Sequence, residues 1–185
     1  MEEDVGMSGA EAFLERVRRA AADSEDLRDT ITPGELEAVE RQLGFPLHPF
    51  LAALYTTVGN GGFGPMDGLL RLCAPELTDQ DGRTGLGTTL RFRAEAGSGR
   101  RWPADVLPIL AWGCGMMACV DCRSADGTVL LYEPNANEGA DTSAAWFVDS
   151  PSLADWLRTW LDRCGWYEDD QADLPVWSEV ADRLR

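Results

Sequence analysis

The stretch ITPGELEAVERQLGFPLHPFLAALYTTVGNGGFGP, residues 31–65, carries the clearest local signals in the chain. Thr32 can cap a helix, Pro33 suits the first helical position, and Glu35 stands where a capping box needs an acid. Apolar side chains then recur at helical spacing up to Gly44, a residue that suits a helix end because glycine tolerates positive φ. These signals predict a helix between Thr32 and Gly44.

Two further helices are expected on either side of this one. Pro49 can open a helix whose apolar side chains continue to the glycine-rich residues 59–62, where a helix end is expected. Residues 9–22 place apolar side chains at helical spacing with Glu and Arg between them, and this pattern predicts an amphipathic helix. The first third of the chain is therefore expected to be helical.

The periodicity changes after these helices. Asp126-Gly127 is a good hairpin turn. Residues 73–103, rich in Gly, Thr and Arg, are expected to form a long irregular excursion. Short apolar segments on either side of that excursion are expected to be strands: 69–72, 106–112, 116–122, 128–133 and 146–148.

The C-terminal part returns to helical spacing. Ser150-Pro151 opens a helix that places Trp156 and Trp160 on one face, where such a pair usually packs into the core, and Gly165 closes it. A last helix is expected within 175–184. Helices, then strands, then helices predict a single α+β domain, with N-terminal helices and a C-terminal helix packed on an antiparallel sheet. We divide the chain into an N-terminal helical extension (1–30), the main domain (31–165) and an acidic, helical C-terminal extension (166–185).

The charge balance limits the class of partner. The 185 residues hold 32 acids and 16 bases, a formal net charge of −16 and a sequence pI near 4.3, and every base is Arg. Nucleic-acid phosphates and anionic membranes both need clustered basic residues, so neither is an expected partner. An acidic surface suits a basic protein partner through long-range attraction, and it equally suits simple solubility.

The N-terminus begins Met1-Glu2-Glu3-Asp4, which lacks the basic start and apolar run of a secretory signal, and no apolar run is long enough to span a membrane. We therefore expect a cytoplasmic protein. Five cysteines are an odd number, so reduced thiols are expected.

Residues that carry chemistry are few. His48 is the single histidine and has no Ser or Cys motif beside it, so a catalytic triad is not expected. Cys119 and Cys122 have the spacing of half a zinc site, but three residues apart on a strand they would point to opposite faces. Together with Cys114, they are better explained as packed free thiols. Neither an enzyme nor a metal or cofactor site is expected.

The glycine-rich residues 59–64 follow a helix, whereas a phosphate-binding loop precedes one. A helix end that leads into a strand is the preferred interpretation. An exposed Phe63 beside this turn would make a plausible contact with a partner.

Several blocks in this order resemble the SUKH superfamily, the family of Smi/Knr-type cell-wall regulators and bacterial toxin-immunity proteins. The stretch ITPGELEAVE at 31–40 resembles a family helix with a characteristic Glu, and it is followed by a linking segment and a turn similar to those of the family. Further on, a second block is similar to one subgroup, and the last block resembles the closing helix. The blocks span roughly 31–162: LGFPL at 43–47, NGGFGP at 60–65, LPI at 107–109, WGC at 112–114, CVDC at 119–122 and WLRTWL at 156–161.

The sequence departs from the family pattern at two places. His48 stands where the family commonly has a Pro, and Ala111 stands where the subgroup has an Asp before Trp-Gly-Cys. If that Asp makes a family contact, this chain lacks it.

The resemblance implies a non-enzymatic protein-binding domain. The preferred hypothesis is an immunity-type protein that neutralises a cognate bacterial toxin, expected to be a basic domain, by stoichiometric binding. The alternative is an intracellular scaffold or regulator of the Smi/Knr type that has no toxin partner. The acidic segments, the 60–67 turn and the 114–122 block are the expected binding surface. The residues expected to contact the partner are Asn60, Gly61, Gly62, Phe63, Asp67, Trp112, Asp121 and Glu133.

Overall fold

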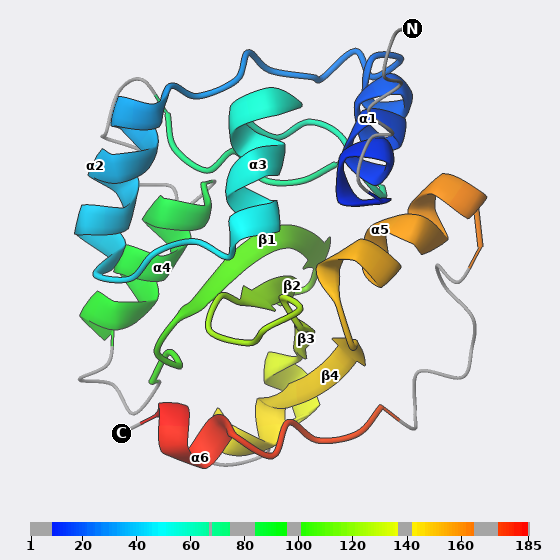
Figure 1. The fold of residues 1–185 in the computed structure, drawn as a ribbon. Coiled ribbons are helices and arrows are strands. Elements are labelled where there is room, and N and C mark those ends of the chain that lie inside the picture. The colour runs from blue at the N-terminus through cyan, green and yellow to red at the C-terminus, as the bar shows by residue number, and fades with distance from the viewer. Residues whose placement is uncertain are drawn as a thin grey trace, which may run out of the picture.

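The computed structural model describes residues 9–66, 68–74, 84–95, 101–136, 142–164 and 174–184. Figure 1 shows how its elements are arranged around a central sheet. The elements are α1 (Gly9–Ala21), α2 (Pro33–Leu43), α3 (Pro49–Thr57), α4 (Gly85–Ala94), β1 (Val106–Gly113), β2 (Met116–Asp121), β3 (Val129–Tyr132), β4 (Trp146–Ser150), α5 (Leu153–Asp162) and α6 (Val180–Arg183).

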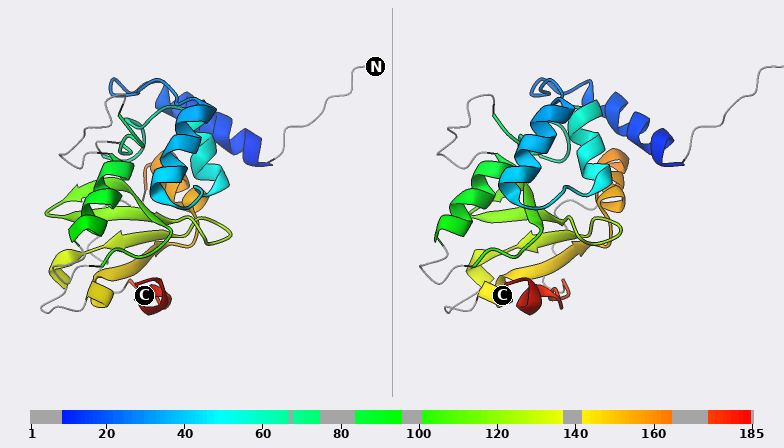
Figure 2. Two further views of the ribbon diagram at one scale, coloured as in Figure 1. Left: turned by 90° about the vertical axis from the view of Figure 1, so that its left-hand side faces the viewer. Right: turned by 60° about the vertical axis from the view of Figure 1, so that its left-hand side comes forward.

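The sheet is an antiparallel meander whose strands lie in the order β1-β2-β3-β4. Figure 2 shows α1, α2 and α3 on one face of the sheet and α6 on the other. The single α+β domain with an antiparallel sheet is therefore confirmed. The hairpin predicted around Asp126-Gly127 is present, since β2 and β3 pair antiparallel and residues 122–128 connect them, with Gly127 at φ 64°.

Each face of the sheet covers its own core, because successive side chains of a strand point to opposite faces. In β2, Ala118 and Val120 face the helices, while Met117 and Cys119 face the other way. The helix-side core contains apolar residues of α1, α2, α3 and α5, including the buried Trp156 with the half-buried Trp160 packed against it. We call the opposite cluster the aromatic core: Phe92, Trp102, Val106, Met117, Cys119, Leu130, Tyr132, Ala145, Trp146, Trp177 and Val180.

The helix starts predicted from the sequence are present. Thr32 and Glu35 form a complete capping box, and Gly44 ends α2 at φ 77°. Beyond this end, the carboxylate of Glu40 accepts a hydrogen bond from the Leu47 backbone N–H at 2.8 Å, which fixes the link between α2 and α3. His48 then caps α3.

Residues 69–72 do not form the predicted strand. Arg71 makes a single bridge to Thr84, and the Leu70 N–H donates one hydrogen bond to Ile109 of β1. The next N–H, that of Leu72, donates to the side chain of Asn60 at 2.8 Å. A side chain has therefore taken a backbone group that a strand would use in a ladder.

Residues 73–103 were predicted to be irregular, and α4 contradicts this within the described residues. The sequence of α4, GLGTTLRFRA, has two Gly and two Thr and therefore low helix propensity. Tertiary contacts compensate, because Leu86 and Phe92 are buried and Arg93 donates a hydrogen bond to the carbonyl of Leu43 at 2.6 Å.

The C-terminal helices are shorter than predicted. Arg163 ends α5 in the left-handed conformation, and Gly165, its predicted end, lies outside the described residues. The predicted helix within 175–184 is reduced to α6. Residues 175–177, which were predicted to be helical, instead run along β4. The Val148 N–H donates to the Pro175 carbonyl, and the Trp177 N–H donates to the Trp146 carbonyl. Backbone hydrogen bonds to a sheet edge replace a helix here.

A buried ion pair fastens α6 to the sheet. The Arg183 guanidinium lies 2.8 Å from the carboxylate of Asp121, and the two side chains are 5% and 2% exposed. Glu179 and Asp105 lie near the same guanidinium at 3.0 and 3.6 Å. Burial raises the pKa of Asp121, while the Arg123 N–H and Arg183 oppose the rise.

Replacing Arg183 with alanine should lower the free energy of unfolding by about 3–5 kcal/mol, because Asp121 would stay buried without its charged partner. Urea denaturation followed by Trp fluorescence measures this loss. Arg123→Ala, which removes an exposed arginine beside Asp121, is the matched control and should change stability by less than about 0.5 kcal/mol. Equal losses in the two variants would contradict the role given to the buried pair.

Two carboxylates next to α5 have pKa shifts of opposite sign. Burial raises the pKa of Asp149, although the indole N–H of Trp156, 2.9 Å from this carboxylate, opposes the rise. A hydrogen bond from the Ser152 hydroxyl lowers the pKa of Asp155, and Arg158 lowers it further. A raised pKa weakens folding as the pH rises through the folded-state value, whereas a lowered pKa weakens folding as the pH falls through it.

Asp149→Asn keeps an oxygen that can accept from Trp156 but removes the desolvated charge. Its stability relative to the parent chain should therefore rise between about pH 3 and pH 7. Asp155→Asn, in α5, is the matched variant, and its relative stability should fall over the same range. Urea denaturation at several pH values measures both trends, and parallel trends would show that the two charges do not act as described.

Candidate functional site

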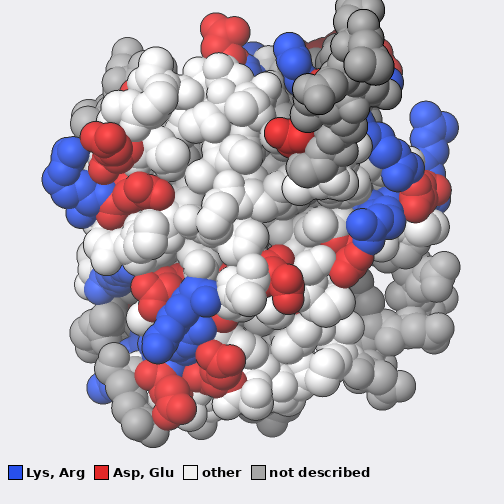
Figure 3. Space-filling view, in the orientation of Figure 1, with Lys and Arg blue, Asp and Glu red and all other residues white. Residues whose placement is uncertain are grey.

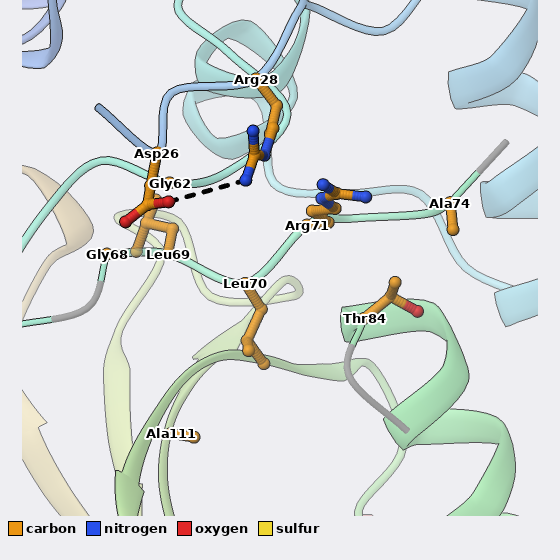
Figure 4. Close-up of a pocket in the computed structure, with 10 residues that line it drawn as sticks. All are labelled: Asp26, Arg28, Gly62, Gly68, Leu69, Leu70, Arg71, Ala74, Thr84 and Ala111. Carbon is orange, nitrogen blue, oxygen red and sulfur yellow. Dashed lines mark ion pairs between the residues drawn. The ribbon is translucent and has the colours of Figure 1, made fainter. Parts of the chain in front are cut away.

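A pocket of about 480 Å³ lies where four segments of the chain meet. It is formed by the segment before α2, the turn after α3, the extended residues before α4, and the end of β1 (Figure 4). Its lining residues are Asp26, Arg28, Gly62, Gly68, Leu69, Leu70, Arg71, Ala74, Thr84 and Ala111.

The glycines of the turn allow these segments to approach. A Cβ on Gly62 would lie 1.8 Å from the carbonyl oxygen of Asp26, and a Cβ on Gly61 would lie 2.6 Å from that of Leu69. Both glycines have positive φ, 78° and 81°. Only glycine combines this conformation with so close a contact, so the NGG sequence is required by the crossing of three chain segments.

Asn60 holds the same crossing together from inside. Its side-chain amide donates to the carbonyl of Cys73 at 2.9 Å and accepts from the N–H of Leu72 at 2.8 Å. Its backbone N–H donates to the carbonyls of Arg28 and Asp29. One residue thus connects the turn to both walls of the pocket.

Two arginines line this pocket in a strongly acidic chain. Arg28 makes one long ion pair, 3.6 Å to Asp26, and the two side chains are 46% and 74% exposed. Arg71 is exposed and makes no ion pair with any residue that the structure describes. Figure 4 shows the two guanidinium groups toward one end of the pocket, and Leu70 and Ala111 toward the other. The pocket is therefore cationic at one end and apolar at the other.

The structure separates the residues predicted to contact a partner. Gly62 lines the pocket, while Asn60, Gly61 and Phe63 are buried around it, Phe63 with only 1% exposure. The expectation that Phe63 is exposed is therefore wrong, because its ring is buried in the helix-side core. Asp67 lies outside the described residues.

The other three predicted residues lie away from the pocket lining. Trp112 is half-buried against Trp156, with ring centroids 6.3 Å apart. Asp121 is buried in its pair with Arg183, so its side chain has no surface to offer to a partner. Glu133 is half-buried and accepts a hydrogen bond from the Asn135 N–H at 2.7 Å.

The residues considered for chemistry have structural roles. Cys119 packs in the aromatic core and Cys122 against the helix-side core, so these thiols do lie on opposite faces of the sheet. Burial raises the pKa of both thiols, that of Cys122 to about 12. His48 accepts from the Phe50 N–H and, through its other ring nitrogen, donates to the Ala125 carbonyl at 3.1 Å.

Sequence reasoning did not identify the cationic side chains of this pocket. Arg28 and Arg71 lie far apart in the sequence, in segments without regular periodicity, and only the crossing at the NGG turn brings them together. One available signal was Ala111, which departs from the subgroup pattern and lines the same pocket. Within the described residues, no group of three or more His, Cys, Asp or Glu side chains is arranged to hold a metal ion.

Asn60→Ala should lower the free energy of unfolding by about 2–4 kcal/mol, because the buried N–H of Leu72 and carbonyl of Cys73 would lose their partners. Urea denaturation measures the change. Gln42→Ala, at an exposed position of α2, is the control and should have an effect below about 0.5 kcal/mol. A similar effect of both variants would mean that Asn60 does not hold the crossing together.

No curated protein matches the chain. None of the described helices combines the length and apolar character that crossing a membrane requires. The family model described as the SMI1 / KNR4 family (SUKH-1) matches residues 30–159, which is more than half of the chain and includes α2, α3, the NGG turn and the whole sheet. The chain therefore belongs to the SMI1 / KNR4 family (SUKH-1).

Proposed function

We propose that this chain is a non-enzymatic protein-binding domain that neutralises a cognate toxin by stoichiometric binding, as an immunity-type member of its family. The observation that carries the proposal is an open pocket with two arginines, Arg28 and Arg71, on a chain of net charge −16. Such a surface offers a partner both a broad negative field and one positive position. Charge patterns of this kind favour one partner over others.

The environment of the reactive side chains supports binding rather than catalysis. A nucleophilic cysteine needs a lowered pKa, whereas burial raises the pKa of Cys119 and Cys122. The single histidine, His48, uses both ring nitrogens to hold α3 and the β2–β3 connection in place.

The face of the molecule that carries α3 has the composition of a protein interface. Figure 3 shows a largely uncharged region over α3, with charged side chains on either side of it and below it. The sequence of α3, PFLAALYTT, contains no charged residue, and Pro49 and Thr57 are exposed on it. Interfaces commonly combine an uncharged centre with a polar rim. An acidic surface would also speed association with a basic toxin domain.

The second candidate is an intracellular scaffold or regulator of the Smi/Knr type. The description of the matched family, which names SMI1 and KNR4, favours it. Such a protein would bind a cellular partner without neutralising any toxin.

Capture of partners from the native lysate, followed by a growth assay, distinguishes the two candidates. The tagged full chain should retain one stoichiometric protein. Expression of that protein alone should arrest the growth of a test bacterium, and coexpression of this chain should restore it. A captured partner that does not affect growth would contradict neutralisation and favour the scaffold.

The salt dependence of the complex tests the electrostatic part separately. If the acidic surface attracts a basic partner, the association rate should fall by about tenfold or more between about 0.05 and 0.5 M NaCl, because salt screens attraction between exposed charges. Stopped-flow or surface-binding kinetics measure the rate. An unchanged rate would contradict long-range attraction of the partner by the acidic surface.

A further inference from the structure

We infer that the pocket beneath the NGG turn binds a single carboxylate of the partner polypeptide, an acidic side chain or a terminal carboxylate, between Arg28 and Arg71. The aliphatic part of the bound group would lie on Leu70 and Ala111. The inference rests on the proposed function, because a protein partner supplies the carboxylate, and it names the chemistry of one contact in that complex.

The two arginines of the pocket can bind an anion. Arg71 has no ion pair with a described residue, and Arg28 has only the long contact of 3.6 Å to Asp26. Both side chains line one pocket of about 480 Å³, which is large enough to admit an amino-acid side chain. A guanidinium binds a carboxylate through charge-assisted hydrogen bonds.

The shape and the remaining charge of the pocket favour a carboxylate over a phosphate. Asp26 also belongs to the lining, so the charges of Arg28, Arg71 and Asp26 sum to a single positive charge, which one singly charged carboxylate balances. The rest of the lining is mainly apolar, with Leu69, Leu70 and Ala111, and suits the methylene groups of a side chain.

The wall that carries these arginines is held in place before any partner arrives. Asn60 binds the backbone of residues 72 and 73, and Gly62 donates its N–H to Leu69 at 2.9 Å. The side chains of Arg28 and Arg71 are therefore mounted on backbone that is already fixed, which reduces the ordering cost of binding. A basic partner that presents one acid at this position would fit, whereas a basic partner without that acid would leave two arginines facing its positive surface.

The test uses the isotope-labelled full chain and follows backbone amide signals during titration. The probe is N-acetyl-L-glutamic acid α-amide, which carries a single side-chain carboxylate, and its neutral glutamine analogue is the matched control. Inorganic phosphate at equal ionic strength is the third probe. The glutamate probe should shift the signals of Arg28, Gly62 and Arg71 with a dissociation constant on the order of millimolar, as expected for one small contact. The neutral analogue should leave them unchanged.

Matched arginine variants separate specific binding from general charge effects. Arg71→Gln should weaken binding of the glutamate probe by about tenfold, because one charge-assisted contact is lost. Arg41→Gln, at an exposed position of α2 outside the pocket, should bind like the parent chain. Both variants should retain the dispersed amide spectrum of the folded chain.

Three results would overturn the inference: no shift with the glutamate probe, equal shifts in both variants, or tighter binding of phosphate. The titration needs no partner protein, so its outcome is independent of the capture experiment. A chain that binds the probe but captures no toxin would keep the pocket assignment for a different partner. A chain that neutralises a toxin but ignores the probe would lose the pocket assignment alone.

Discussion

The side chain of Asn60 closes the crossing on which the arrangement of the N-terminal half depends. Three chain segments meet there, and only glycines allow their backbones to approach so closely. The two side-chain hydrogen bonds of Asn60 supply partners for the backbone N–H of Leu72 and the carbonyl of Cys73, in place of a strand ladder. The segment that leads to α4 is thereby held against the turn after α3. The same hydrogen bonds fix the backbone that forms one wall of the pocket.

Local signals explain which parts of the fold could be predicted. Three features depend only on residues close in the sequence and could therefore be predicted from it. They are the capping box at Thr32 and Glu35, the end of α2 at Gly44 and the alternation of side chains in β2. The helix α4 could not be predicted, because its Gly and Thr residues disfavour a helix until Leu86 and Phe92 are buried by partners distant in the sequence.

The same distinction applies to the candidate site. The NGG turn was found from its composition, but composition does not reveal exposure, and Asn60 and Phe63 proved to be interior residues. Asp121 was likewise predicted to contact a partner, since charged residues usually face solvent. It is instead buried against Arg183, which lies 62 positions away in the sequence. The pocket arginines come together only through tertiary structure, and no pattern of spacing between them could indicate it.

The attachment of α6 through Arg183 has a consequence for where the domain can be cut. The family match ends at residue 159, yet the described residues after it supply Trp177 and Val180 to the aromatic core and a counter-charge to Asp121. A fragment that ends at residue 159 would expose the aromatic core and would leave the buried carboxylate of Asp121 without its charged partner. The unit that folds is thus larger than the unit shared by the family, and its boundaries must be taken from packing rather than from sequence similarity.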